Sequence, residues 1–324
     1  MSGVRELLKI IVNEPFVFIQ CHDFPDHDAV ASAFGLHTLL LKQSITSRII
    51  YAGCLQRDSL IRMIEKLGIP IKHVGEYSIK KKDKIIIVDG CKGNKNVTDL
   101  VGDEIAIIDH HELQHGTLPE DLKFRDIRSQ YGACASIIFD YYKELEIDIP
   151  HTIASALLMG ILIDTALMTR GVDIKDLEAY STLYKLSDIP FVNNILRNKL
   201  QVKDLDFYKT ALNRVKISRG VAFCYFDEGC NQNLLGIIGD FFLSLQEVEF
   251  VFLCAKNSDM INFSVRSESE KWNAAWVIQE ILKNEGFGGG HSDMAGGILE
   301  KIRYFDEKKY HSRLLEYLGV SKNR

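Results

Sequence analysis

Residues 104–111 read Glu-Ile-Ala-Ile-Ile-Asp-His-His, an apolar run that stops at one carboxylate and two imidazoles, Asp109, His110 and His111. Four to eight apolar residues bounded by polar ones predict an interior strand. In open α/β sheets, ligands bind beyond the carboxyl ends of the parallel strands. The three polar side chains are therefore expected to face a shared crevice. The alternative for this stretch alone is a strand that runs into a polar loop.

A second strand end carries the same kind of side chain. Phe16–Cys21 is a β-rich apolar run that precedes a helix expected over Ala29–Leu41. The loop between them places His22, Asp26 and Asp28 within a few residues of one another. A strand, a polar loop and a helix form one half of a βαβ unit. One nitrogen and several carboxylate ligands suit Mn²⁺, Mg²⁺ or Fe²⁺. The alternative is an N-capping aspartate with unrelated polar neighbours.

Two further apolar elements end in a carboxylate. The strand expected over Ile85–Val88 stops at Asp89, and the nearly all-apolar helix expected over Ile153–Ile163 stops at Asp164. An ionised carboxylate in such surroundings is costly unless it is paired or bound to a metal. Arg170 follows this helix closely, where it either reaches a phosphate or lies at the surface.

The candidate metal ligands come from four strand or helix ends, and they are His22, Asp26, Asp28, Asp89, His110 and Asp164. This set is too large for one ion that also holds water and substrate, and it fits two. Two ions bridged by a carboxylate can hold a hydroxide for attack on phosphorus and neutralise the phosphate. We expect Asp89 to be the bridge, and His111 to bind the phosphate or assist proton transfer to the leaving oxygen. The residues alone thus indicate two-metal hydrolysis of a phosphate ester or anhydride.

The composition predicts an ordinary soluble protein. Of the 324 residues, 26% are charged and 46% are hydrophobic, and the formal net charge is −5. This charge argues against a protein that coats long duplex nucleic acid, whereas bound metals could attract a short anionic ligand. The cysteines are scattered and form no Cys-x-x-Cys pair, which predicts reduced thiols in a cytoplasmic protein. We expect no secretory signal, because Val4–Val12 is predicted to form a short amphipathic helix. We expect no contact with a membrane, because the most apolar run is interrupted by Asp164 and is too short to span one.

We expect an α/β fold with two domains. A doubly wound, parallel-sheet catalytic domain that binds the metals is expected over residues 1–190, followed by a linker over 191–204, where the sequence turns polar. A smaller α/β substrate-binding domain is expected over 205–324, with one strand over Ile261–Arg266. The active site is expected in the cleft between the domains, where closure would exclude water.

A glycine-rich turn in the second domain is a candidate phosphate site. Gly288, Gly289 and Gly290 offer backbone N–H groups that can surround phosphate oxygens, and the adjacent His291 can donate to one of them. The alternative is a plain flexible loop.

Taken together, these motifs resemble those of the DHH phosphoesterase family. The triplet Asp109-His110-His111 resembles the signature of the family, and the run His22-x-x-x-Asp26-x-Asp28 resembles its first motif. Asp89 resembles the second motif and Asp164-Thr165 the fourth. The Gly-Gly-Gly-His run, with Arg266 and Ser267 upstream, resembles the DHH-associated substrate domain. The resemblance covers nearly the whole chain, and every metal-ligand position is filled.

The resemblance implies two divalent ions, with manganese expected and magnesium or iron as alternatives. One ion would be held by His22, Asp26 and Asp89, and the other by Asp28, Asp89, His110 and Asp164. Substrate would be bound by Arg266, Ser267, Gly288, Gly289, Gly290 and His291, with Arg170 as a further candidate. The glycine run is similar to that of nano-RNases (oligoribonucleases) and of linear or cyclic diadenylate phosphodiesterases. The expected function is therefore a manganese-dependent phosphodiesterase that converts very short oligonucleotides, such as a diadenylate dinucleotide, to mononucleotides.

Several alternatives stay open. His27 stands where the family commonly has a small residue, and Ala166 replaces the glycine that is common after Asp164-Thr165, which puts the substrate in question. A 3′-phosphoadenosine 5′-phosphate phosphatase could use the same architecture, and a manganese pyrophosphatase or exopolyphosphatase shares the first domain. A nucleotide-sensing binding module is the non-enzymatic alternative. The expected partner is a short oligonucleotide or dinucleotide, and formation of a homodimer is left open.

Overall fold

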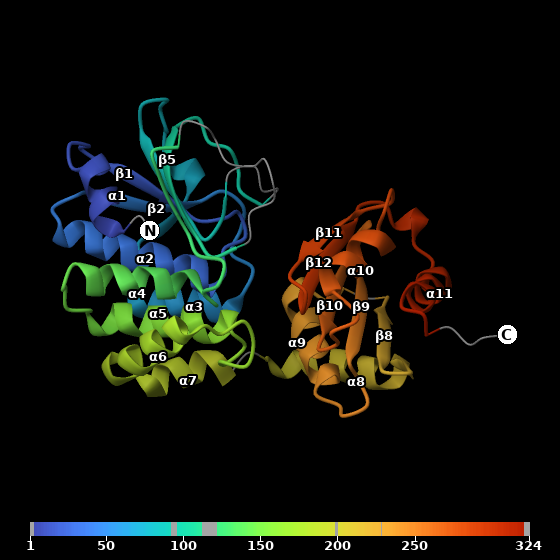
Figure 1. Ribbon diagram of the computed structural model, residues 1–324. Helices are drawn as coiled ribbons and strands as arrows, with labels where there is room; N and C mark the ends of the chain where they lie inside the picture. The colour runs from blue at the N-terminus through green and yellow to red at the C-terminus, as the bar shows by residue number, and fades with distance from the viewer. Residues whose placement is uncertain (1–2, 92–95, 112–121, 198–199, 228, 321–324) are drawn as a thin grey trace. The chain divides into compact units, whose positions relative to one another are not determined.

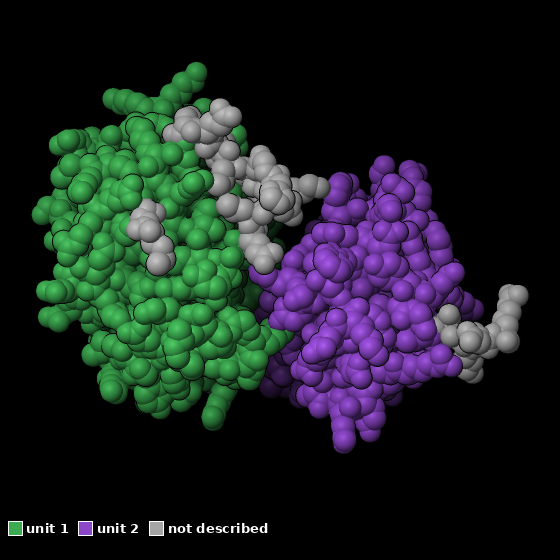
Figure 2. Space-filling model, in the orientation of Figure 1, with its two compact units in different colours: residues 1–199 green, residues 200–324 purple. Residues whose placement is uncertain are grey.

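The computed structural model describes residues 3–91, 96–111, 122–197, 200–227 and 229–320. The chain divides into two compact units, unit 1 over residues 1–199 and unit 2 over residues 200–324 (Figure 2). Each unit has its own β-sheet (Figure 1). Each unit also has its own hydrophobic core.

The sheet of unit 1 is parallel throughout the described residues, with the strand order β3-β2-β1-β4-β5-β6. The strands are β1 Val17–Gln20, β2 Ser47–Tyr51, β3 Ile71–His73, β4 Lys84–Val88, β5 Asp103–Asp109 and β6 Phe124–Ile127. The first strand, β1, lies in the middle of the sheet. Strands β2 and β3 extend the sheet on one side of β1, and β4, β5 and β6 extend it on the other side. This is the strand order of a doubly wound α/β sheet, and the expected fold class is confirmed.

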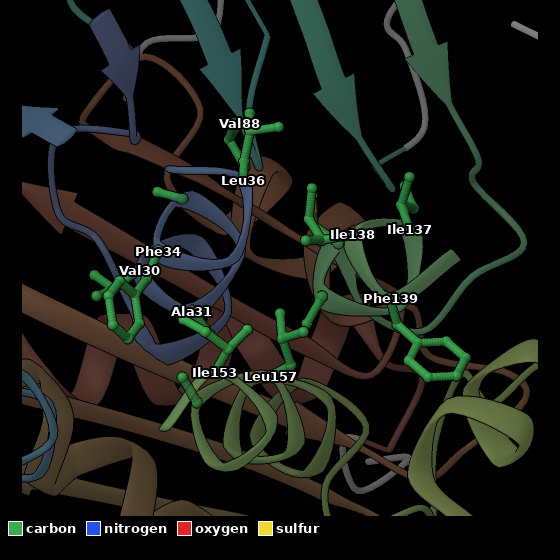
Figure 3. Packing of buried hydrophobic residues seen from close by; sticks show 14 of the residues in the cluster. Val30, Ala31, Phe34, Leu36, Val88, Ile137, Ile138, Phe139, Ile153 and Leu157 are labelled. Carbon is green, nitrogen blue, oxygen red and sulfur yellow. The ribbon is translucent and has the colours of Figure 1, made fainter. Parts of the chain in front are cut away.

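The helices of unit 1 cover one face of this sheet. They are α1 Val4–Ile11, α2 His27–Lys42, α3 Asp58–Leu67, α4 Cys134–Glu144, α5 His151–Asp164, α6 Ile174–Leu186 and α7 Ile189–Arg197, with a 3-10 turn, η1 Val74–Glu76. Ile19, Ile86 and Ile108 of the central strands share one buried core with residues of α1 to α7. Figure 3 shows part of this core, with labelled side chains of α2, α4 and α5 and with Val88 of β4 near Leu36 of α2.

The other face of the sheet is covered by segments that do not belong to helices α1 to α7. Phe18, Ile87 and Ile107 pack with Cys91 and Val97, which follow β4, in a second and smaller core. Both faces of the central strands are therefore buried. This explains why these strands are almost continuously apolar instead of alternating with polar residues.

The segment expected to be a linker, residues 191–204, begins inside helix α7. Val192, Ile195 and Leu196 of this helix are buried in the core of unit 1. Their spacing gives an otherwise polar segment one apolar face, so the helical part belongs to unit 1. Residues 198 and 199 lie outside the described residues.

Unit 2 contains a mixed sheet, with the strand order β11-β12-β10-β9-β8-β7 in the described residues. The strands are β7 Lys216–Ser218, β8 Val221–Phe226, β9 Phe250–Asn257, β10 Met260–Ser267, β11 Phe287–Gly290 and β12 Met294–Leu299. β8 and β9 are parallel, and the other neighbours are antiparallel.

Helices pack on both faces of this second sheet. They are α8 Leu205–Arg214, α9 Gln232–Leu243, α10 Ala274–Ile281 and α11 Glu307–Tyr317, with 3-10 turns η2 Val202–Asp204 and η3 Ile302–Tyr304. One core joins the sheet to α10 and α11, and the other joins it to α8 and α9. Unit 2 is thus a second α/β unit.

The cysteines form no disulfide bond with one another in the described residues, and each is buried except Cys54. Within the part of the chain that the structure describes, no helix has both the length and the apolar character needed to cross a membrane.

Candidate metal centre

The candidate ligands of unit 1 lie where the strand order reverses. β1, β4 and β5 are neighbours in the sheet, and their carboxyl ends lead into His22, Asp89 and His110. Asp28 lies in the first turn of α2, and Asp164 is the last residue of α5. Ligands of open α/β sheets bind at this kind of switch point.

Asp26 is both the N-cap of α2 and a candidate ligand. Its Oδ1 accepts hydrogen bonds from the backbone N–H groups of Asp28 (2.9 Å) and Ala29 (3.1 Å). Burial raises the pKa of this carboxyl, but the charges of His22 and Arg57 and the backbone hydrogen bond outweigh it and bring the pKa to about 2. Burial lowers the pKa of His22. An ionised carboxylate beside a neutral imidazole is the state in which both bind a metal.

Asp28 joins α2 to the start of α4. Its carboxylate accepts the backbone N–H groups of Cys134 (2.6 Å) and Ala135 (2.9 Å), so it caps α4 from another element. The side chain is fully buried. Burial and the neighbouring charge of Asp164 raise its pKa to about 8. A cation bound beside Asp28 would reverse this shift.

Asp89 lies at the centre of the cluster. Its Oδ2 is 3.9 Å from His22 Nε2, and its Oδ1 is 3.4 Å from His110 Nε2 and 3.7 Å from His111 Nδ1. The residue adopts φ +58°, a left-handed conformation that Asp tolerates better than most residues. The chain therefore turns at Asp89, directly after strand β4. Burial, followed by the charge of Asp28, raises the pKa of Asp89 well above its usual value.

His110 is oriented by a backbone carbonyl. Its Nδ1 lies 3.1 Å from the carbonyl oxygen of Tyr131, which can only accept, so Nδ1 carries the proton. Nε2 then points to Asp164 Oδ2 at 3.1 Å and to Asp28 Oδ2 at 4.0 Å. Burial lowers the pKa of His110, but the Asp164 and Asp89 carboxylates outweigh it and raise the pKa well above its usual value.

Asp109 holds His111 in place. One oxygen, Oδ1, accepts the backbone N–H groups of His110 (2.8 Å) and His111 (3.2 Å) and lies 2.8 Å from His111 Nδ1. Burial raises the pKa of Asp109, but the hydrogen bond with His111 outweighs it, so the pKa falls below its ordinary value. The His111 ring is therefore tied through Nδ1, and the side chain remains partly exposed, at 36%.

A left-handed turn follows Asp164. Ala166, Leu167 and Met168 adopt φ of +47°, +61° and +66° in succession. Thr165 stabilises the turn, since its Oγ1 donates to the Ile161 carbonyl (2.6 Å) and accepts from Met168 N–H (3.1 Å). The turn also fixes the backbone of Arg170, whose N–H donates to the Thr165 carbonyl at 3.0 Å. Positive φ angles at three successive non-glycine residues are backbone strain. Backbone strain of this kind persists only where surrounding contacts impose it, and it often marks functional sites.

In unit 2, Arg266 and Ser267 are buried in contacts with their own unit. Arg266 Nε donates to Asp240 Oδ1 of α9 at 2.6 Å, and Nη1 donates to the Val265 carbonyl at 3.0 Å. Ser267 Oγ donates to the Trp272 carbonyl at 2.6 Å and accepts from Ser269 N–H at 3.2 Å. Ser267 thus stabilises a turn, while Arg266 is fixed against the face of α9.

The glycine run expected as a turn forms the edge strand β11. A Cβ at Gly288 would lie 2.8 Å from Ile278 Cγ1, and one at Gly297 of β12 would lie 2.5 Å from Leu282 Cδ1. These glycines let α10 pack closely on the sheet. Gly289 points to the opposite face, where a Cβ would meet nothing within 4 Å. Gly290 has φ +145°, and the N–H of His291 donates to the Met294 carbonyl at 2.7 Å.

The side chains of the unit 1 cluster fit a pair of divalent ions. Three groups each place ligand atoms within 4.8 Å of one another: His22 with Asp26 and Asp89, Asp28 with His110 and Asp164, and Asp89 with His110 and His111. Asp89 Oδ1 and His110 Nε2 are buried and find no hydrogen-bond partner among the described residues. Carboxylate oxygens and inward-pointing imidazole nitrogen atoms form the donor set expected for Mn²⁺, Mg²⁺ or Fe²⁺.

Family models agree with this geometry. Residues 16–161 match the DHH family N-terminal domain, and residues 218–311 match the DHHA1 domain. The chain belongs to the DHH family. The DHH match falls within unit 1 and contains the candidate metal ligands except Asp164, which lies three residues beyond it. The DHHA1 match falls within unit 2 and contains the glycine strand β11.

Known proteins resemble the chain over half of its length or more. It is 29% identical to the uncharacterized protein MJ1633 of Methanocaldococcus jannaschii, over 94% of this chain and 64% of that protein. It is 24% identical to a probable manganese-dependent inorganic pyrophosphatase of Lactobacillus acidophilus, over 54% of this chain and 56% of that protein. The chain thus spans less than two thirds of the length of either of these relatives.

Solved structures share the fold. An exopolyphosphatase-related protein from Bacteroides fragilis superposes with a TM-score of 0.81 at 18% identity, over 98% of this chain and 96% of that one. RecJ from Thermus thermophilus, in complex with Mn²⁺, gives 0.58 at 15% identity, over 98% of this chain and 54% of that one.

The sequence predicted that Asp109 faces the site but not that it orients His111, and it gave no indication of Tyr131 or Arg57. Asp109 fixes His111, the Tyr131 carbonyl fixes His110, and Arg57 lies near enough to Asp26 and His22 to lower their pKa values. A strand-terminal aspartate directly before two histidines was the signal for Asp109. Tyr131 is brought to His110, and Arg57 to Asp26, only by the tertiary fold.

Proposed function

We propose that this DHH-family chain is a manganese-dependent phosphodiesterase that hydrolyses very short oligonucleotides to mononucleotides. The position of Asp89 carries the proposal. Its two carboxylate oxygens face different histidines, His22 on one side and His110 on the other, at 3.9 and 3.4 Å. A carboxylate placed between two ligand groups is suited to bridge two ions.

The residues divide into two sets around this bridge. His22 and Asp26 would hold one ion together with Asp89, while Asp28, His110 and Asp164 would hold the other. When bound, two such ions supply Lewis-acid charge at the phosphate and lower the pKa of water. Manganese is favoured because the name of the pyrophosphatase relative includes it, and because the donors are carboxylates and imidazoles.

His111 is suited to act on the substrate. Asp109 holds Nδ1 at 2.8 Å, which fixes the ring and turns Nε2 away from Asp109. A histidine oriented in this way by a carboxylate can hold a proton at Nε2 for a phosphate oxygen or for the leaving oxygen. We therefore propose that His111 transfers a proton and that Asp109 orients His111.

Unit 2 favours a substrate that carries a base. Phe287 and Ile298 are directly paired in β11 and β12 and are 56% and 43% exposed, and Gly289 beside them has open space. Aromatic and apolar surface beside exposed backbone suits a nucleobase, because every base has a face that can stack. His291, which ends the glycine run, is suited to bind a phosphate oxygen.

A pyrophosphatase is the second candidate, favoured by the names of the curated relatives. The match to the Lactobacillus acidophilus pyrophosphatase covers 54% of this chain. An all-phosphate substrate would make no use of the apolar surface at Phe287 and Ile298. We therefore propose a short oligonucleotide as the first candidate substrate and pyrophosphate as the second.

Product analysis with Mn²⁺ tests the proposal. A diadenylate dinucleotide, longer oligoribonucleotides, 3′-phosphoadenosine 5′-phosphate and pyrophosphate are offered in parallel to the full chain. Rapid release of mononucleotide from the dinucleotide, and slower release from longer chains, is expected. Turnover of pyrophosphate alone would replace the proposal with the second candidate. Binding of the dinucleotide without turnover of any substrate would instead identify a nucleotide-sensing module.

A further inference from the structure

The segment between β6 and α4 contacts the candidate centre at two neighbouring points. The backbone N–H of Arg128 donates to the Asp109 carbonyl at 2.9 Å, and the Tyr131 carbonyl accepts from His110 Nδ1 at 3.1 Å. The Arg128 contact fixes Asp109 at the end of β5, and the Tyr131 contact fixes the ring of His110. The position of this segment therefore decides where His110 Nε2 points.

Tyr131 is held from its side-chain end by a charged cluster. Its hydroxyl donates to Asp140 Oδ2 of α4 at 2.8 Å and accepts from Arg128 Nη1 at 3.1 Å. Arg128 Nη1 also donates to Asp140 Oδ2 at 2.7 Å, and its guanidinium carbon lies 5.1 Å from the centre of the Tyr131 ring. Both ends of Tyr131 are thus fixed, the carbonyl at His110 and the hydroxyl at α4.

Arg128 is anchored in turn to β6. Its Nε and Nη2 each donate to Asp126, at 2.8 Å to Oδ1 and 2.8 Å to Oδ2, and Tyr141 of α4 donates to the same carboxylate at 2.9 Å. The side chains are largely buried, with 11% of Arg128 and 5% of Asp126 exposed. A buried ion pair of this kind adds little stability compared with apolar packing, and its best-supported role is to specify one arrangement.

We infer that Arg128 and Tyr131 are positioning residues that set the tautomer and direction of His110, and through it one of the two metal sites. The inference rests on the proposed two-metal centre. A metal-binding histidine usually donates its other ring N–H to an oriented acceptor, and loss of that partner weakens metal binding. Here the acceptor is a backbone carbonyl, so its position depends on the side chains that hold Tyr131.

The test compares two variants with a matched control in the full chain. Tyr131→Phe removes the hydroxyl contacts to Asp140 and Arg128, and Arg128→Lys keeps the charge but loses the forked pairing with Asp126. Tyr142→Phe is the control, because its buried hydroxyl on α4 donates to the Gly35 carbonyl at 2.9 Å, away from the Arg128–Tyr131 segment. Mn²⁺ titration gives the affinity of each ion. NMR of isotope-labelled histidine rings in the Mg²⁺-loaded chain gives the His110 tautomer.

In the unaltered chain we expect two bound ions and His110 with its proton on Nδ1. In Tyr131→Phe and Arg128→Lys one ion should bind about 10-fold more weakly or worse while the other is unchanged, the range found when outer partners of ligands are lost. The His110 ring signals should shift or broaden in both variants and stay unchanged in Tyr142→Phe. Unchanged His110 signals and metal affinities, or equal weakening in the control, would overturn the inference. Failure of the unaltered chain to bind Mn²⁺ would instead overturn the proposed function.

Discussion

Gly160 of α5 makes room for Asp28 of α2. A Cβ at position 160 would lie 2.8 Å from Asp28 Oδ1 and 3.2 Å from the Asp28 Cα. Glycine inside a helix costs about 0.5–1 kcal/mol relative to alanine, so a reason other than helix stability is needed here. The close approach lets the buried carboxylate reach the first turn of α4 and the metal cluster together.

Gly160→Ala should displace Asp28 and weaken Mn²⁺ binding, although alanine is the better helix former. Overpacking of this kind costs about 1–3 kcal/mol of the free energy of unfolding. Metal titration and thermal unfolding measure the two effects. Gly35→Ala is the matched control, because its Cβ would lie 2.8 Å from Ile138 Cγ2 and touch no candidate ligand. Equal loss of metal affinity in both variants would show that general packing is responsible.

Asp89→Asn should reduce hydrolysis by more than about 100-fold, the loss seen when one preorganised group that stabilises charge is removed. Asparagine is preferred to alanine for this test because residue 89 adopts φ +58°, which Asn tolerates. Removal of a buried ionisable carboxyl beside Asp28 should also raise the melting temperature of the metal-free chain, because the folded state no longer has to hold a proton that the unfolded state releases. Steady-state kinetics with Mn²⁺ and calorimetry without metal check the two effects. Near-normal turnover would contradict the bridging role.

The metal-free chain should lose stability as the pH rises from about 4 to about 8. The pKa of Asp28 rises from 3.8 to about 8 in the folded state, and burial raises that of Asp89 as well. A raised pKa means that the folded state keeps a proton that the unfolded state has released, so stability falls as the pH approaches the folded value. Bound Mn²⁺ stabilises the ionised carboxylates. The rise in melting temperature on adding Mn²⁺ should therefore be larger at pH 8 than at pH 6, and an equal rise at both would contradict this account.

Ala166→Gly should stabilise the chain. Ala166 begins the left-handed turn after Asp164 with φ +47°, and a non-glycine residue in this region costs about 1 kcal/mol or more. Relief of that strain should raise the melting temperature by about 2–4 °C for a unit of this size. Ala154→Gly, inside α5, is the opposite control and should lower it. A lower melting temperature for Ala166→Gly would show that the turn is not strained at this residue.

His291→Ala should raise KM for a dinucleotide while leaving the Mn²⁺ stoichiometry unchanged. His291 is exposed after the glycine strand of unit 2, whereas the candidate ligands belong to unit 1. Substrate kinetics and a metal titration on the same preparation separate the two effects. Loss of bound metal in this variant would show that His291 is misassigned.

The strands that carry candidate ligands were predictable because each is a short apolar run ended by Asp or His. The structure finds β1, β4, β5 and α5 within a few residues of the expected bounds. Helix α6 was missed because polar and apolar residues are interspersed along it, and few of its side chains are buried. Its start has a local signal, a capping box in which Asp173 and Asp176 each bond the backbone N–H at the other end of the turn.

Contacts between distant elements could not be predicted from the sequence. Asp28 caps a helix that starts more than 100 positions later in the chain, and the carbonyl that orients His110 belongs to Tyr131. The glycine run was expected as a turn because glycine weakens strands. It forms a strand because α10 packs where a side chain at Gly288 would lie. In each case tertiary packing, and not local preference, decides the outcome.

All candidate metal ligands lie between residues 22 and 164, within unit 1. Because the N-terminal part of a nascent chain generally folds first, the ribosome can present a complete set of ligands while it is still translating unit 2. Binding of the ions would then add its free energy to the folding of a partly synthesised protein. The manganese supply of the cell at the time of translation would therefore influence how many chains reach the native state, before any substrate is bound.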